Sequence, residues 1–131
     1  MSQKVVVNGA AFNKAVVRQV NKFIKEVTRA IKREMQNLMR QPKSGRVYKY
    51  RGRSHRASAP GESPAIRSGK LFKSIRESFP NAQTGVIEVD APYAGFLEQG
   101  TKFTARRPFV APAIKTVREQ IQRGGLKSLA D

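Results

Sequence analysis

The feature that most constrains this chain is a helical pattern that runs from about residue 10 to residue 40. Its apolar residues recur in steps of three and four, so they would form one stripe along a single helix. Pro42 follows and cannot continue the pattern, because proline lacks the backbone N–H that a helix interior needs. The pattern predicts a long helix that covers a sheet formed by the rest of the chain. The stripe consists of Phe12, Val16, Val20, Phe23, Val27, Ile31, Met35 and Leu38.

Basic residues occupy the opposite side of this predicted helix. They advance in the same steps from a start two residues later, which places them about 200° around the helix from the apolar stripe. Two interpretations remain open: a solvated face, or a surface directed toward nucleic acid or an acidic neighbour. Binding to a membrane surface is disfavoured, because valine rather than bulky aromatic residues dominates the apolar stripe. The basic residues are Lys14, Arg18, Lys22, Lys25, Arg29 and Arg33.

The excess of basic residues extends over the whole chain: 26 Lys and Arg against 9 Asp and Glu give a net charge of +17. Such a charge attracts an anionic partner, but it does not choose between nucleic acid, an acidic protein surface and an anionic membrane. A length of 131 residues with 39% hydrophobic content fits a single domain, residues 1–131. The chain has no cysteine, no apolar run of the roughly 20 residues that span a bilayer, and no signal-peptide pattern. We therefore expect a soluble protein made in a reducing cytoplasm and without a membrane partner.

Residues 42–64 contain three prolines, three glycines and many basic residues, which predicts a flexible basic arm rather than a packed element. Tyrosines alternate with basic residues at 48–51, a mixture suited to gripping nucleic acid or a partner. The alternative is a β-hairpin whose tyrosines cover the core. His55 is the only histidine, so no metal site is expected. The candidate contact residues are Arg46, Tyr48, Lys49, Tyr50, Arg51, Arg53 and Arg56.

The second half of the chain predicts a short helical turn, a hairpin and a second helix. The turn lies in KLFKSI, 70–75, and the strands at 74–79 and 85–89 alternate inward and outward residues. The helix runs from 108 to 123, with Phe109, Ala113, Val117 and Ile121 on one stripe. The predicted fold class is α+β: a small antiparallel sheet packed against a long N-terminal helix and a shorter C-terminal helix, with a long basic loop or arm.

The order of these elements, together with four short motifs, resembles a family of small neck proteins of long-tailed bacteriophages, the minor head-tail joining and tail-completion proteins. The motifs lie in SAPGESPAIRSGKLFKSI, APYAGFLEQGT and ARRPFVAPAI, and the resemblance covers nearly the whole chain. It implies a structural virion protein that forms a ring between the DNA-filled head and the tail, without catalysis, metal or cofactor. The implied partners are further copies of the chain and the adjacent head-completion, connector and tail-tube or tail-terminator proteins.

The resemblance implies a protein of the virion neck that is synthesised in the host bacterial cytoplasm. It does not account for the basic excess, which is this sequence's own feature and allows non-specific contact with the genomic DNA. The alternative function is therefore a free-standing nucleic-acid-binding protein that does not read sequence. Against that alternative stands the lack of any known base-reading motif.

Glu98 is an isolated acid in a basic region, and we expect it to fix the crossing between two segments. A turn of helix over 93–98 would precede Gly100, where glycine allows a positive φ. Glu98 would then form an ion pair with Arg106 or Arg107. A catalytic role is disfavoured, because no second carboxylate or histidine lies at a suitable spacing. The residues of this structural motif are Tyr93, Glu98, Gly100, Thr101, Arg106, Arg107, Pro108 and Phe109.

No phosphate-binding loop, hydrolase elbow or metal-ligand spacing occurs in the sequence, which favours a non-enzyme. Glu88 and Asp90 stand two apart on a predicted strand, so we expect them on its outward face, toward solvent or a neighbouring subunit.

Overall fold

The computed structural model describes residues 3–8, 14–66, 69–102 and 105–124. It contains a three-stranded sheet, a separate two-stranded hairpin and four helices in these ranges. The elements are β1 (Gln3–Asn8), α1 (Lys14–Arg40), β2 (Val47–Tyr50), β3 (Arg53–Arg56), α2 (Lys70–Lys73), β4 (Ile75–Asn81), β5 (Thr84–Val89), α3 (Ala94–Gln99) and α4 (Val110–Gly124).

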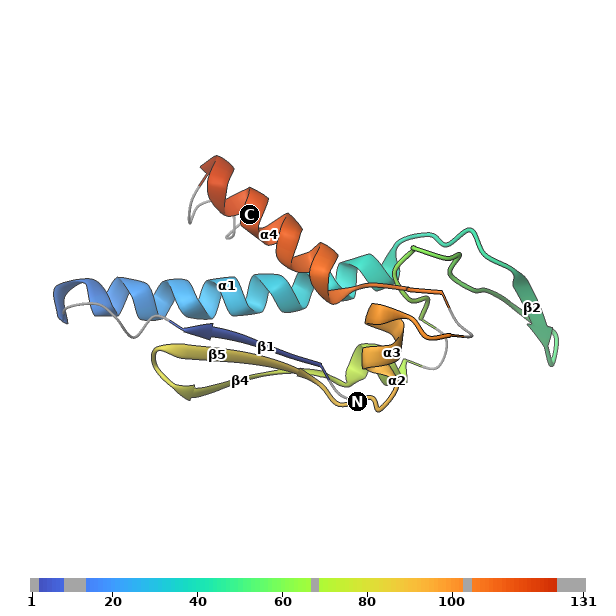
Figure 1. Cartoon of the computed structure of the whole chain (residues 1–131), viewed down its shortest axis with the longest axis horizontal. Helices are drawn as coiled ribbons and strands as arrows, with labels where there is room; N and C mark the ends of the chain where they lie inside the picture. Colours follow the sequence, from blue (N-terminus) through green and yellow to red (C-terminus); the bar gives the residue numbers. More distant parts are fainter. Residues whose placement is uncertain (1–2, 9–13, 67–68, 103–104, 125–131) are drawn as a thin grey trace.

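The body of the molecule is built around α1, which lies along one face of the sheet (Figure 1). Helix α4 packs against α1 on a side away from the sheet, and the short helices α2 and α3 lie near the C-terminal end of α1. The hairpin formed by β2 and β3 projects from that same end, beyond the rest of the molecule. The α+β class and the arrangement of a small antiparallel sheet with one long and one shorter helix are as predicted.

The sheet has the order β1-β5-β4, and both pairings are antiparallel. The β4–β5 hairpin was predicted, and the structure places its turn at Ala82 and Gln83. The pairing of strand β1 was not predicted, because its short run of valines does not indicate the distant segment with which it pairs. It pairs with β5 from Gln3 opposite Val89 to Asn8 opposite Thr84, so β5 becomes the central strand.

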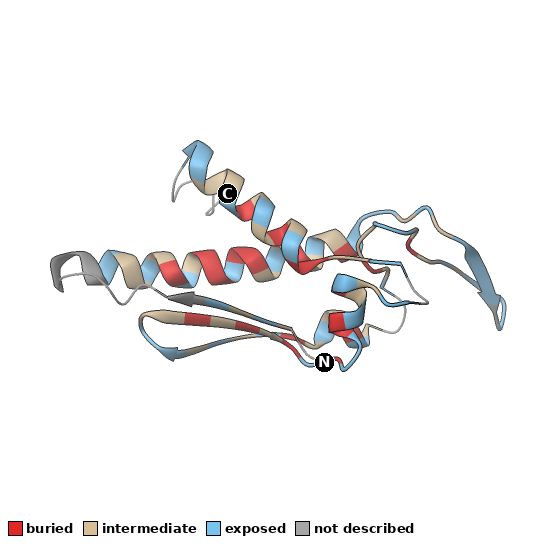
Figure 2. Cartoon of the chain, in the orientation of Figure 1, coloured by how far each residue is buried: buried red, intermediate tan, exposed pale blue. Residues whose placement is uncertain are grey.

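The core forms where α1, the sheet and α4 meet (Figure 2). Val27, Ile31 and Met35 are buried as the apolar stripe predicts, whereas Phe23 and Leu38 are only half-buried. The buried surface of α1 is wider than the apolar stripe, because α4 covers a second side of the helix in addition to the side covered by the sheet. It therefore also includes Ile24, Thr28, Ala30 and Met39. From α4 and its start, Phe109, Ala113 and Val117 are buried as predicted.

Helix α1 and strand β5 approach very closely at Thr28 and Gly85. A Cβ atom on Gly85 would lie only 3.0 Å from the Cβ of Thr28 and would overlap its hydroxyl oxygen. The Thr28 hydroxyl, fully buried, donates a hydrogen bond of 2.7 Å to the carbonyl oxygen of Ile24. Glycine at position 85 thus sets the distance between the helix and the sheet.

The basic side of α1 is exposed at all of the described positions, Arg18, Lys22, Lys25, Arg29 and Arg33, which confirms the predicted second stripe; the side chain of Lys14 is outside the described part. Arg29 lies over the ring of Phe79 and pairs with Glu77 of β4 at 3.6 Å.

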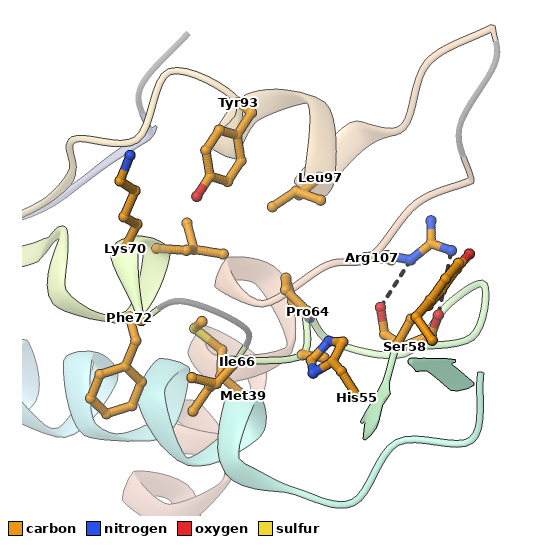
Figure 3. Close-up of a pocket in the computed structure, with 15 residues that line it drawn as sticks. Met39, His55, Ser58, Pro64, Ile66, Lys70, Phe72, Tyr93, Leu97 and Arg107 are labelled. Carbon is orange, nitrogen blue, oxygen red and sulfur yellow. Dashed lines mark hydrogen bonds between the residues drawn. The ribbon is translucent and has the colours of Figure 1, made fainter. Parts of the chain in front are cut away.

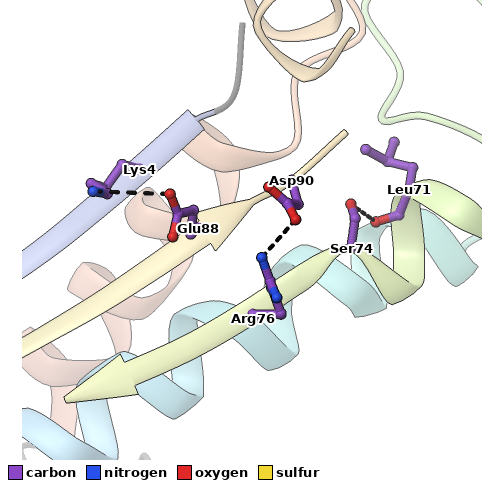
Figure 4. A network of polar contacts seen from close by, with 6 residues as sticks. All are labelled: Lys4, Leu71, Ser74, Arg76, Glu88 and Asp90. Carbon is purple, nitrogen blue, oxygen red and sulfur yellow. Dashed lines mark hydrogen bonds and ion pairs between the residues drawn. The ribbon is translucent and has the colours of Figure 1, made fainter. Parts of the chain in front are cut away.

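The outer face of the sheet carries ion pairs between neighbouring strands (Figure 4). Lys4 lies 3.9 Å from Glu88, and Arg76 lies 2.6 Å from Asp90. Glu88 and Asp90 therefore point outward as predicted, and each is already close to a cation of its own chain. Because these pairs are exposed to solvent, each contributes at most about 1 kcal/mol. No helix in the described ranges is both long enough and apolar enough to cross a membrane.

Candidate functional site

Glu98 binds the start of α4 through three backbone N–H groups. Its Oε1 accepts hydrogen bonds of 2.9 Å from Phe109 and Val110, and its Oε2 accepts one of 2.9 Å from Ala111. The first N–H groups of a helix have no partner within the helix, and the helix dipole is positive there. A buried carboxylate from another element therefore satisfies both the hydrogen bonds and the charge.

The predicted ion pair between Glu98 and Arg106 or Arg107 is wrong. Arg106 Nε donates to the backbone carbonyl oxygen of Glu98 at 3.0 Å, and Arg107 Nε donates to Ser58 Oγ at 2.9 Å. The N–H groups of Phe109 and Val110 compete better for the carboxylate, because both residues are buried, whereas Arg106 is exposed and can be solvated by water. The sequence does contain a sign of this capping. The segment ARRPFV at the start of α4 has no Ser, Thr, Asp or Asn that could cap the helix locally, so a residue from elsewhere must supply the acceptor.

The rest of the predicted motif is arranged around this cap. Helix α3 follows Tyr93 as expected, and Gly100 ends it with φ 77°, which confirms the need for glycine there. The chain then returns so that Arg107 N donates to the carbonyl oxygen of Leu97 at 2.7 Å. Phe109 is fully buried, which confirms it as the packing anchor of α4. Pro108 is half-buried and Thr101 is exposed.

Residues 106 and 107, where the chain returns after α3, also bind the base of the hairpin. Gly61 N donates to the carbonyl oxygen of Arg106 at 2.8 Å, and the Arg107 guanidinium binds both the hydroxyl and the carbonyl oxygen of Ser58. The SAPGESP and ARRPF segments, more than 40 residues apart, therefore lie side by side.

Glu62 closes the base of the hairpin with hydrogen bonds of the same kind as those of Glu98. Its carboxylate accepts from Ala59 N at 2.6 Å, Ser44 N at 3.1 Å and Ser44 Oγ at 2.8 Å. These hydrogen bonds, from Ala59 first and then Ser44, lower the pKa of Glu62 from 4.5 to about 2. Beside it, burial lowers the pKa of Lys43, and the charge of Glu62 partly offsets this. Lys43 Nζ donates to the carbonyl oxygen of Leu38, at the end of α1.

The predicted basic loop is not confirmed in the form expected, because its central part is a regular hairpin. Tyr48 pairs with His55, and Lys49 pairs with Ser54. The turn residues Arg51 and Gly52 both have positive φ, 49° and 77°, as a two-residue hairpin turn requires. Hydrogen bonds between β2 and β3 thus order a segment that lacks contacts with the core.

The candidate contact residues lie on both faces of this hairpin. Tyr48 is 51% exposed and does not cover the core, and Arg46 lies over its ring; the side chain of Tyr50 is outside the described part. Lys49 and Arg56 belong to the face opposite Tyr48. Among the described residues, no carboxylate lies within ion-pair distance of Lys49 or Arg53. The hairpin therefore presents basic side chains that the described part of the chain does not neutralise.

A groove of about 320 Å³ lies between the hairpin, α2 and α3 (Figure 3). Its lining comes from distant parts of the chain, including Met39 at the end of α1, Leu71 of α2 and Leu97 of α3. Sequence reasoning missed it, because no periodic pattern links these segments. His55 lines the groove, and no group of three or more metal-binding side chains occurs in the described ranges.

Comparisons with known protein families, with curated proteins and with solved structures found no match to this chain.

Proposed function

We propose that this chain is a structural subunit of a phage neck, forming a ring that joins the DNA-filled head to the tail. The observation that carries the proposal is the meeting of the quoted motifs at one place. SAPGESP, the Glu98 segment and ARRPF come together through Gly61–Arg106, Ser58–Arg107 and the cap on α4. Three of the four motifs on which the resemblance depends therefore meet where the projecting hairpin joins the body.

A projecting element of this kind suits assembly into a ring. Head-to-tail rings need two different surfaces on each subunit, one that reaches out and one that receives. The hairpin extends beyond the body (Figure 1) and exposes Val47 and Tyr48, which the body leaves uncovered. Its contacts with the adjacent neck proteins, or with the next copy in the ring, would bury these side chains.

The proposal gives Glu98 a structural task. Both of its carboxylate oxygens are used by backbone N–H groups of α4, and the residue is 8% exposed. A catalytic acid or base needs an oxygen that reaches a substrate proton. The contacts of Glu98 thus support a structural role for this residue.

The test is a stop codon in the gene within the phage or prophage that encodes it. We expect filled heads and finished tails that remain separate in electron micrographs, and infectious particles after purified protein is added to the extract. Normal particles from the mutant would overturn the proposal. Unjoined particles that the purified protein cannot rescue would also count against it.

A second candidate function, sequence-independent nucleic-acid binding, is favoured by the exposed basic side of α1. Lys22 and Lys25 are exposed on the same side, and no carboxylate among the described residues pairs with them. A protein that binds phosphates in this way should lose duplex affinity steeply between about 50 and 200 mM salt. Inside a ring, the same surface would contact the passing genome, so the two functions are compatible. Binding to DNA together with normal head-tail joining in the stop mutant would favour the second alone.

A further inference from the structure

The groove beside the hairpin gathers exposed apolar side chains. Six large apolar residues are exposed among the described residues, and three of them, Tyr48 at 51%, Ile66 at 37% and Tyr93 at 43%, line this groove. In Figure 3, Tyr93 and Leu97 lie on one side of the groove, and Pro64, Ile66 and His55 on the other. An apolar concentration of this kind marks a binding surface, because exposed apolar side chains scattered singly would not converge on one hollow.

The charge around the groove is positive. Lys70 and Arg107 contribute to its lining, and none of the described Asp and Glu residues does. The guanidinium of Arg107 donates to Ser58 and to the carbonyl oxygen of Ala105, which are neutral acceptors, so its charge is not balanced there. A ligand that fits must therefore combine an apolar part with negative charge.

We infer that this groove binds a short acidic segment of another protein. A bulky apolar side chain of that segment enters between Tyr93 and Ile66, and its flanking carboxylates lie near Arg107. A volume of about 320 Å³ accommodates a large side chain but not a folded element. The inference holds whether or not the protein is a neck subunit, because it depends only on the chemistry of the groove.

A second copy of this chain is poorly suited as the occupant. Between Arg76 and Lys102 the chain has no basic residue and carries four of its nine acids, so this is its best candidate for an acidic segment. All four acids already have partners: Glu77 and Glu88 are close to Arg29 and Lys4, Asp90 to Arg76, and Glu98 caps α4. The stretch is also folded into β4, β5 and α3, and a strand inside a sheet cannot enter a groove of this size.

Nucleic acid also fits less well. Bases bind single-stranded sites by stacking on aromatic rings. Tyr48, His55, Phe72 and Tyr93 supply rings of that kind, but the lining also holds Met39, Ile66, Leu71 and Leu97, which suit an aliphatic side chain better than a base.

The experiment measures binding of labelled peptides to the purified full chain by fluorescence anisotropy at 150 mM salt. The probe is a twelve-residue peptide of Asp and Glu with a central Leu-Phe pair. The matched peptides replace that pair with Ala-Ala or reverse the charges with Lys, and a twelve-nucleotide thymidine strand serves as competitor. We expect the acidic Leu-Phe peptide to bind at least tenfold more tightly than either matched peptide.

The protein variants locate the site. Ile66→Ser combined with Tyr93→Ser should weaken the acidic Leu-Phe peptide at least tenfold. Phe96→Ser is the control, because Phe96 is 53% exposed on the same helix that follows Tyr93 but does not line the groove. Its affinity should equal that of the parent. In the unmodified protein, methyl NMR signals of Met39, Ile66 and Leu97 should shift on titration with the same peptide.

Equal binding of the Leu-Phe and Ala-Ala peptides, or no peptide binding at all, would overturn the inference. Unchanged affinity in the double variant would do so too. Displacement of the peptide by the thymidine strand, with loss of strand binding in the double variant, would assign the groove to nucleic acid instead. The methyl shifts decide the question if the double variant does not fold, and their absence would contradict the inference.

Discussion

Two carboxylates in this molecule, those of Glu98 and Glu62, accept hydrogen bonds from backbone N–H groups in different surroundings. Glu98 accepts hydrogen bonds from backbone N–H groups at the start of α4. Glu62 accepts them from Ser44, which is distant in the sequence, and from Ala59, which is in the adjacent turn. Glu98 is buried between α3 and α4, whereas the hydrogen bonds of Glu62 to Ser44 lie at the exposed base of the hairpin. Burial decides what each one stabilises: without water as a substitute, loss of Glu98 leaves donors unsatisfied, while around Glu62 water can replace the carboxylate.

The molecule therefore consists of two parts. Apolar packing and the Glu98 cap stabilise the body, and polar contacts at its base hold the hairpin. The hairpin has little apolar burial of its own; every described residue from 46 to 49 and from 51 to 54 is exposed. Its position therefore depends on Glu62, Lys43 and Arg107 rather than on the core. The body and the hairpin can consequently be perturbed separately.

The largest effect is expected from Glu98→Gln. The amide nitrogen of glutamine would face backbone donors of α4, and the charge that complements the helix dipole would be lost. We expect the free energy of unfolding to fall by about 2 to 4 kcal/mol, measured by urea denaturation. Arg106→Gln is the control that tests the discarded ion pair, and it should cost less than about 1 kcal/mol. Equal losses in the two variants would restore the pairing of Glu98 with Arg106.

Gly85→Ala should destabilise the body next most strongly. The added methyl group would overlap the Thr28 side chain, so α1 and β5 must move apart. Overpacking of this kind costs about 1 to 3 kcal/mol. Gly45→Ala is the counterpart in the hairpin, because its Cβ would lie 2.5 Å from the carbonyl oxygen of Ala57. We expect it to speed amide exchange in β2 and β3 while the unfolding midpoint stays near that of the parent; a large shift of the midpoint would show that body and hairpin are one unit.

The lowered pKa of Glu62 predicts that the stability of the hairpin, but not that of the body, depends on pH. Its pKa in the folded protein, about 2, is lower than the usual 4.5, so its stabilisation is complete above pH 4.5 and is lost as the pH falls toward 2. The protection of the Gly45 and Ala57 amides, which bond across the hairpin base, should fall over that range when exchange is compared with the intrinsic rate at each pH. Glu62→Gln should show the lower protection already at neutral pH, and Glu119→Gln on α4 should behave like the parent. A Glu62 carboxyl that titrates at 4.5 by NMR would contradict this account.

The smallest effect is expected from Arg51→Asn. Arg51 adopts φ 49°, a conformation that most residues avoid and that asparagine tolerates. The substitution should stabilise the hairpin by less than about 1 kcal/mol. It should therefore slow amide exchange in β2 and β3 without altering the body. Faster exchange would mean that the arginine side chain itself stabilises the turn.

The sequence predicted the parts of this molecule that depend on local patterns. The stripes of α1 and α4, the β4–β5 hairpin and the positive φ of Gly100 follow from periodicity and from glycine's freedom. What it could not predict depends on contacts between distant segments. Strand β1 needs β5 as a partner, and the groove needs several distant segments at once. The oxygens of Glu98 were assigned to arginines because the missing N-cap residue before α4 does not reveal which distant carboxylate replaces it.

The base of the hairpin is a second case in which contacts between distant segments overrode a prediction from local composition. Composition predicted an extended arm at 42–64, since proline, glycine and basic residues usually oppose a packed element. The Arg51-Gly52 turn and the contacts of Glu62 and Arg107 nevertheless fold its central part. Whether the hairpin is flexible in solution stays a prediction, which the exchange measurements above address.

The central claim is that the chain forms a ring at the head-tail junction, with the hairpin contacting neighbours. Cryo-electron microscopy of particles from the encoding phage tests this most directly. The account predicts a ring between head and tail into which α1, the sheet and α4 fit as one body, with density from an adjacent protein or copy against β2 and β3. Particles whose neck contains no density for this chain would contradict it.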